Sequence, residues 1–116
     1  MNTRLEYLYR DGSNYKQHHE VVMQGGISED DLRPLLWEHE FFRPSAVGLP
    51  DLQHRFREQG YAFPNEDDHP WHEIESVAAT EDPPTVDVTA AAFLSRMRAC
   101  HVKGWEHFSI RVGMRP

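Results

Sequence analysis

Cysteine and long apolar stretches are nearly absent from this sequence of 116 residues. Cys100 is the only cysteine, which excludes a disulfide within one chain and a zinc site built from several thiolates of one chain. No apolar run approaches the roughly 20 residues that a membrane-spanning helix needs. The first residues also lack the apolar centre of a signal peptide. We therefore expect a cytoplasmic protein that does not enter a membrane.

Acidic residues outnumber lysine and arginine by 19 to 12, which gives a formal net charge of −7. This balance argues against general binding to the backbone of DNA or RNA. Residues 58–95 contain no lysine or arginine, whereas in residues 90–116 Glu106 is the only acidic residue. The asymmetry predicts a homodimer or higher homo-oligomer in which the basic end of one chain contacts the acidic segment of another. Contact within one chain and an ordinary solvated surface are the alternatives.

The sequence motifs of several common enzymes are missing. It contains no GxSxG, no phosphate-binding P-loop and no GxGxxG. Cys100 falls on the apolar stripe of an expected helix, so we interpret it as a core thiol rather than a nucleophile. Pairs of carboxylates for acid–base chemistry arise by chance in a chain with 19 acidic residues. We therefore favour a non-enzymatic binding or interaction protein.

A β-hairpin is the pattern around which the rest of the chain is organised. Leu5, Tyr7 and Tyr9 occupy every second position, which is the period of a half-buried strand. Residues 11–14, with the sequence Asp-Gly-Ser-Asn, favour a turn. A second apolar stretch follows and ends at two glycines. We predict two antiparallel strands within residues 5–22.

Helices and short strands are expected in the remaining chain. Asp31 is the expected N-cap of a helix that ends near His39, because this start places Pro34 within the first turn. Thr89 is the expected N-cap of a helix that ends at Gly104. The other expected elements are an edge strand at 40–44, a turn at 45–50, a helix at 51–59, a loop at 64–70, and strands at 71–80 and 105–114.

These elements predict one α+β domain that spans residues 1–116. The sheet is expected to be mostly antiparallel, with four or five strands, an N-terminal β-hairpin, and two or three helices packed on one face. The regular alternation of strands and helices that marks a parallel doubly wound sheet is missing. The expected core contains Trp71, Phe93, Leu94, Met97, Phe108 and Ile110.

Four side chains at the expected hairpin tip are the candidate ligand-binding residues: Arg10, Asn14, Tyr15 and Lys16. They combine hydrogen-bond donors with one aromatic ring, which suits an anionic or nucleotide-like small molecule, or the carboxylates of a partner protein. A tight turn would bring Arg10 and Lys16 opposite each other. In the alternative, Arg10 pairs with Asp11 or Glu20, and Lys16 extends into solvent.

Histidine is abundant, with eight residues, and one cluster contains ligands that suit a metal ion. Its members are Asp68, His69, His72 and Glu73. Imidazole and carboxylate groups suit zinc or another divalent transition metal, so a metal-dependent hydrolase is the alternative function. However, neighbouring side chains on a strand point to opposite faces, and no HExxH spacing occurs. We therefore expect surface or capping histidines and no cofactor.

Three sequence blocks carry a resemblance to other proteins: YRDGSNYK at 9–16, VGLP at 47–50 and DHPWHE at 68–73. As a set, they resemble the layout of a widespread group of small bacterial and phage-associated proteins. The resemblance implies one domain over nearly the whole chain and implies no particular reaction. A more distant similarity is to phage proteins that sequester cyclic-nucleotide immune signals. It implies a nucleotide-like ligand and a role related to phage or defence.

Overall fold

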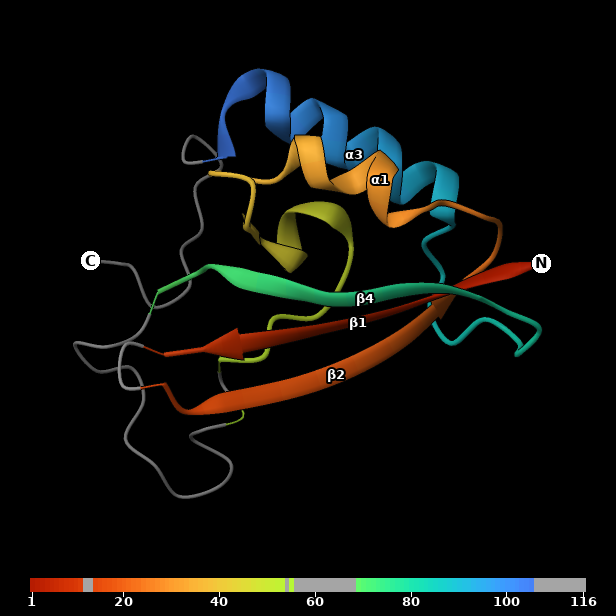
Figure 1. Ribbon diagram of the computed structural model, residues 1–116, viewed down its shortest axis with the longest axis horizontal. Coiled ribbons are helices and arrows are strands. Elements are labelled where there is room, and N and C mark those ends of the chain that lie inside the picture. The colour runs from red at the N-terminus through yellow and green to blue at the C-terminus, as the bar shows by residue number, and fades with distance from the viewer. Residues whose placement is uncertain (12–13, 54, 56–68, 106–116) are drawn as a thin grey trace.

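The described part of the chain forms one antiparallel four-stranded sheet with helices on one face, as the sequence predicts (Figure 1). The computed structural model describes residues 1–11, 14–53, 55 and 69–105. The strand order is β2-β1-β4-β3, so the N-terminal hairpin supplies two neighbouring strands of the sheet. None of the helices in this described part has the length and apolar character needed to span a bilayer.

The hairpin consists of β1 (Asn2–Arg10) and β2 (Lys16–Met23), which pair antiparallel. Every second side chain from Leu5 to Tyr9 is fully buried, as the alternating pattern predicts. The last step of the pairing places Arg10 opposite Lys16. The predicted hairpin is therefore confirmed, with Arg10 and Lys16 opposite each other on its two strands.

The strand expected at 71–80 is present as β4 (His72–Thr80), on the other side of β1. Its pairing register shifts between Glu6 and Tyr7, which leaves Glu75 as an extra residue on β4. Such a β-bulge interrupts the period of two along the bulged strand. It explains why the alternation of apolar and polar residues is imperfect in this stretch of the sequence.

The prediction that Asp31 caps the first helix is wrong. Ser28 is the N-cap of α1 (Glu29–Leu32): its hydroxyl accepts from the Asp31 backbone N–H, and the Asp31 carboxylate accepts from the Ser28 N–H. This capping box starts the helix three residues earlier than expected. Pro34, which has no N–H to donate, then falls beyond the first turn, and the chain continues as the 3-10 turn η1 (Arg33–Leu35).

The first helix also does not extend to His39. Glu38 and His39 have φ values of 54° and 62°, so both lie in the left-handed region. They close a tight turn in which Trp37 and Phe41 form a β-bridge. The turn leads into β3 (Phe41–Phe42), which pairs with β4 at the edge of the sheet and confirms the expected edge strand.

The segment expected as a turn at 45–50 contains a short 3-10 helix, η2 (Pro44–Val47), which Gly48 ends with a φ of 92°. The last described helix, α3 (Ala90–Lys103), begins and ends where predicted. The Thr89 side chain caps its first turn, and the Gly104 N–H closes its last turn. Figure 1 shows α1 and α3 on the same side of the sheet.

The core lies between this face of the sheet and the helices. Phe93 and Met97 of α3 are fully buried, as expected, and Cys100 is buried beside them. Trp71 and Leu94 are only partly buried. Both lie at the margin of the core, so the prediction that they are mostly buried was too strong.

Several predictions fall outside the described residues and stay predictions. These are most of the helix at 51–59, most of the loop at 64–70, the strand at 105–114, and the core positions Phe108 and Ile110. Trp105 is the one described residue of the expected last strand. It is buried, and its indole N–H donates to the Leu35 carbonyl at 2.8 Å.

Candidate functional site

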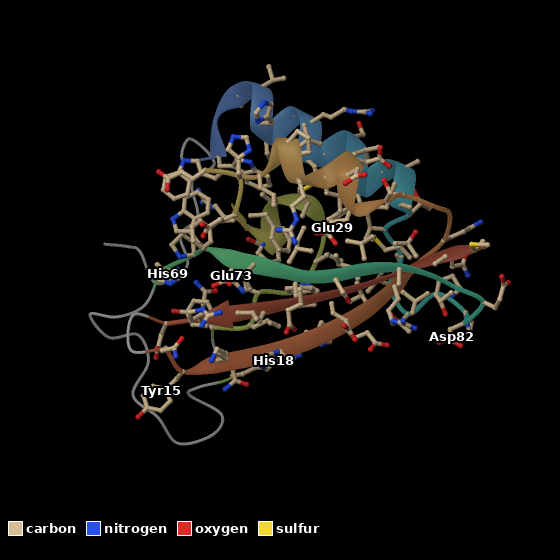
Figure 2. All side chains as sticks on the ribbon, viewed as in Figure 1. Tyr15, His18, Glu29, His69, Glu73 and Asp82 are labelled. Carbon is tan, nitrogen blue, oxygen red and sulfur yellow. The ribbon has the colours of Figure 1, made fainter. Side chains whose placement is uncertain are left out.

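Asp11 organises the described part of the hairpin tip. Its backbone N–H donates to the Tyr15 carbonyl, and its carbonyl accepts from the Asn14 N–H, both at 3.0 Å. Its carboxylate accepts from the Tyr15 N–H at 2.9 Å. Asn14 has a φ of 70°, a left-handed conformation that asparagine tolerates well. These bonds fix the backbone on both sides of Tyr15, a residue that is 58% exposed (Figure 2).

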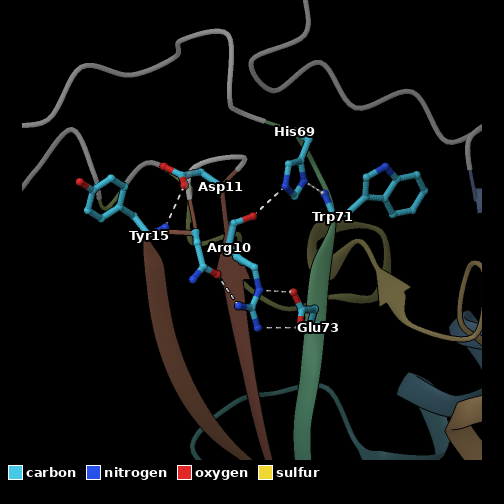
Figure 3. A network of polar contacts seen from close by, with 7 residues as sticks. Arg10, Asp11, Tyr15, His69, Trp71 and Glu73 are labelled. Carbon is cyan, nitrogen blue, oxygen red and sulfur yellow. Dashed lines mark hydrogen bonds and ion pairs between the residues drawn. The ribbon is translucent and has the colours of Figure 1, made fainter.

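Arg10 pairs with a carboxylate from a distant strand (Figure 3). Its Nε and Nη2 donate to the Oε2 and Oε1 of Glu73 at 2.8 and 3.2 Å, and its Nη1 donates to Oδ1 of Asn14 at 2.5 Å. The hydrogen bonds that Arg10 donates to the Glu73 carboxylate raise the pKa of Arg10 above its ordinary value. The partner of Arg10 is therefore Glu73, rather than the Asp11 or Glu20 that the sequence suggested.

Lys16 lies opposite Arg10 and projects from the same face of the sheet. Within the described residues it makes no hydrogen bond or ion pair, and its side chain is exposed. Figure 2 shows Tyr15, His69 and Glu73 at one end of the sheet, with Asp82 at the other. The structure thus brings the predicted residues Arg10, Asn14, Tyr15 and Lys16 together, although their role in binding stays a prediction.

His69 joins the end of β1 to the segment that precedes β4. Its backbone N–H donates to the Tyr9 hydroxyl at 3.2 Å, and its Nε2 donates to the Arg10 carbonyl at 2.7 Å. Its Nδ1 accepts from the Trp71 N–H at 3.0 Å (Figure 3). Both ring nitrogens therefore hold backbone groups in place. Sequence reasoning missed this contact because about 60 residues separate its partners, and no local pattern indicates it.

His72 is a core residue with 0% exposure. Its Nε2 accepts from the Leu52 N–H at 3.0 Å, and its Nδ1 donates to the Pro70 carbonyl at 3.0 Å. Burial lowers the pKa of His72 to about 3, so the ring is neutral at neutral pH. With both nitrogens bonded to the backbone, neither has a lone pair left for a metal ion.

The metal-binding hypothesis gains no support from this geometry. His69 and His72 each use both ring nitrogens, and Glu73 holds Arg10. In the part of the chain that the structure describes, no three or more histidine, cysteine, aspartate or glutamate residues are placed to hold a metal ion. Asp68 lies outside that part, so the cluster and the hydrolase that would use it stay predictions.

Two stacked tryptophans flank the Arg10 network. The rings of Trp37 and Trp71 are parallel to within 6°, with centroids 4.2 Å apart, and the Arg43 guanidinium carbon lies 5.5 Å from the Trp71 ring centroid. Figure 3 shows Trp71 on the opposite side of the network from Tyr15. Sequence reasoning placed Trp37 in a helix and therefore missed this pair, although both rings remain partly exposed.

Comparison with known proteins gives no family to which the chain can be assigned. No protein-family model, curated protein or solved structure matches it. A function must therefore be inferred from the residues themselves, and the hairpin tip gathers Arg10, Asn14, Tyr15 and Lys16 at one place.

Proposed function

We propose that this protein binds an anionic, nucleotide-like ligand at the tip of its hairpin and does not convert it chemically. The observation that carries the proposal is the pairing of Arg10 with Lys16 at the last step of the β1–β2 ladder. Two like charges directly opposite each other on a sheet destabilise the fold. Glu73 compensates the charge of Arg10, and an anion bound at the pair would also compensate the charge of Lys16.

The guanidinium of Arg10 is oriented before any ligand arrives. Glu73 takes its Nε–H and one Nη2–H, and Asn14 takes one Nη1–H, so one N–H on each terminal nitrogen remains outside these bonds. A side chain held in this way loses little freedom when an anion binds. Because Glu73 compensates the charge of Arg10, Lys16 would supply most of the uncompensated attraction.

The aromatic ring of Tyr15 supports the choice of a nucleotide-like ligand. Tyr15 is exposed and directly precedes Lys16 in the sequence, and its backbone is fixed by hydrogen bonds with Asp11. An exposed ring on a rigid turn offers a stacking surface for a base, worth about 1–3 kcal/mol in proteins that bind single strands. Phosphate at Arg10 and Lys16 with a base on Tyr15 would use all of these groups at once.

Thermal melts with AMP, with inorganic phosphate and with a synthetic acidic peptide test this function. A ligand present at 100 times its dissociation constant stabilises the folded chain by about 2.7 kcal/mol. We expect AMP to raise the Tm of the wild type more than phosphate does. The double variant Arg10→Ala/Lys16→Ala should lose the response. A response to the peptide alone would favour a partner protein instead of a nucleotide.

The matched control is Arg4→Ala/Arg98→Ala, which changes the net charge equally. Arg4 lies on the same strand as Arg10 but at its other end, and Arg98 lies on α3. Equal loss of the AMP response in both double variants would mean that only the net charge matters. A sharp fall in the Tm of Arg10→Ala/Lys16→Ala without ligand would make the pair structural. An unchanged response in that variant would refute the site.

We also propose that the chain works in the cytoplasm as a symmetric homodimer, in a role related to phage or defence. The support for the dimer is the separation of charge along the sequence, with an acidic segment at 58–95 and a basic end at 90–116. The phage or defence role rests on the resemblance carried by the blocks at 9–16, 47–50 and 68–73. Sedimentation at high micromolar concentration tests the assembly. A monomer under those conditions would refute the dimer and leave the hairpin site unaffected.

A further inference from the structure

A hollow of about 600 Å³ lies beside α3, formed by three segments that are distant in the sequence. One wall is the turn that contains Gly48 and Pro50, the second is the segment 85–88, and the third is Arg96 of α3. The segment 85–88 bonds to Val22, at the opposite end of β2 from the hairpin tip. The hollow is therefore separate from the site proposed above.

The walls of this hollow are held by hydrogen bonds to the sheet. Thr85 donates its N–H to the Val22 carbonyl at 2.8 Å, and its hydroxyl accepts from the Val22 N–H at 2.9 Å. The carbonyl of Pro50 accepts from the buried Tyr7 hydroxyl at 2.6 Å. Because two of the three walls are anchored to strands, this part of the hollow is formed before any ligand binds, as most small-molecule sites are.

Gly48 allows the Arg96 guanidinium to lie directly against the backbone. A Cβ added at position 48 would overlap the Nη1 atom of Arg96 and would also contact Val88. The φ of 92° at Gly48 is a second reason for glycine at this position. The glycine of the VGLP block therefore makes room for an arginine on α3, and the proline of the same block lines the hollow beside it.

The guanidinium of Arg96 is not engaged by the rest of the described chain. Within the described residues Arg96 forms no hydrogen bond or ion pair, and Asp87, which lines the same hollow, forms none either. The two opposite charges face one space without contacting each other. The Thr85 hydroxyl, which accepts from Val22, still has its own proton to donate.

We propose that this hollow binds a small amino-carboxylate with an apolar side chain. The carboxylate would bind the Arg96 guanidinium and the Thr85 hydroxyl, and the ammonium group would bind Asp87. The apolar part would lie on Val86 and Pro50, which line the same hollow. A phosphate dianion is a poorer fit, because Asp87 would repel it and only one arginine would attract it.

NMR titration of the ¹⁵N-labelled chain with L-leucine and with 4-methylpentanoate tests this site. The second compound is leucine without its amino group. We expect L-leucine at millimolar concentration to shift the amides of Gly48 and of residues 85–88, and the Nε–H of Arg96. The variant Arg96→Gln should raise the dissociation constant about tenfold or more, as expected for the loss of a charge-assisted hydrogen bond. The matched control Arg98→Gln, two residues further on the same helix, should leave it unchanged.

The variant Asp87→Asn tests the ammonium contact separately. It should raise the dissociation constant of L-leucine by up to about fivefold, as expected for the loss of an exposed ion pair. The dissociation constant of 4-methylpentanoate should not change. If the amide signals of Arg96→Gln lose their dispersion, that variant is unfolded and Arg96→Lys replaces it in the test. The lysine keeps the positive charge but lacks the planar guanidinium that can donate two parallel hydrogen bonds to a carboxylate. The proposal is overturned if leucine shifts none of these signals, if Arg96→Gln binds as the wild type does, or if 4-methylpentanoate binds as tightly as leucine.

Discussion

Replacement of His72 should change how the stability of the protein depends on pH. The imidazole is 0% exposed and bonds to the backbone through both nitrogens, to the Leu52 N–H and the Pro70 carbonyl. The folded state therefore stabilises the neutral imidazole relative to the protonated one. In the unfolded chain the same ring titrates at its ordinary value, and this difference links folding to pH.

The expected magnitude follows from the two pKa values of His72, which are 6.5 ordinarily and about 3 in the folded chain. Between these values the unfolded state binds a proton that the folded state does not, so stability falls as the pH falls. The contribution is complete above pH 6.5 and is lost progressively toward pH 3. At up to about 1.4 kcal/mol per pH unit, the loss between pH 7 and pH 5 is about 2 kcal/mol.

Urea denaturation of the wild type and of His72→Gln, each at pH 7 and pH 5, measures this loss. The variant should be less stable at pH 7 by about 1–3 kcal/mol, because its amide satisfies the two backbone groups less well. Between pH 7 and pH 5, the free energy of unfolding of the variant should fall by about 2 kcal/mol less than that of the wild type. Burial and the nearby Arg55 also lower the pKa of His19, but this contribution is common to both chains and cancels. An equal fall in both chains would refute the neutral, buried state of His72.

Three further predictions concern α3. Phe93→Ala should lower the free energy of unfolding by about 3–5 kcal/mol, because the ring is 0% exposed and packs edge-on against Phe42; a loss below about 1 kcal/mol in a denaturant melt would contradict its place in the core. Thr89→Ala should cost about 1 kcal/mol by the same measurement, whereas Thr89→Ser should cost much less because its hydroxyl can still accept from the Ala92 N–H. The Cys100 thiol, whose pKa burial raises to about 11, should react with a thiol reagent at pH 8 only when urea unfolds the chain, and fast reaction of the folded chain would contradict its burial.

Elements that are defined by local sequence signals could be predicted from the sequence alone. Alternation along β1 and the turn residues predicted the hairpin, and Thr89 and Gly104 marked both ends of α3. The start of α1 was misassigned because Ser28 and Asp31 are both good caps. The choice between them depends on the reciprocal hydrogen bonds of the capping box, which Ser28 forms with Asp31 as its third helical residue.

The role of His72 was harder to predict because its partners are backbone groups. The sequence around it suggested ligands for a metal, and an imidazole beside carboxylates is chemically suited to that role. The burial of Ile74 two residues later shows which face His72 occupies, and this alternation was the signal that could have found it. No pattern in the sequence reveals that the Leu52 N–H supplies the hydrogen bond that allows the ring to be buried.

The partner of Arg10 depends on the order of the strands and on a bulge, neither of which the local sequence contains. Because β1 is central, Arg10 has Lys16 on one side and β4 on the other. The bulge at Glu75 lets Glu73 face outward to Arg10, while Val77 still packs against the core. Without the extra residue, Val77 would share the outward face with Glu73 and an apolar side chain would be lost from the core. The same bulge therefore keeps Val77 against the core and lets the Glu73 carboxylate reach Arg10. The orientation of Arg10 at the hairpin tip thus depends on β4, which the hairpin sequence does not contain.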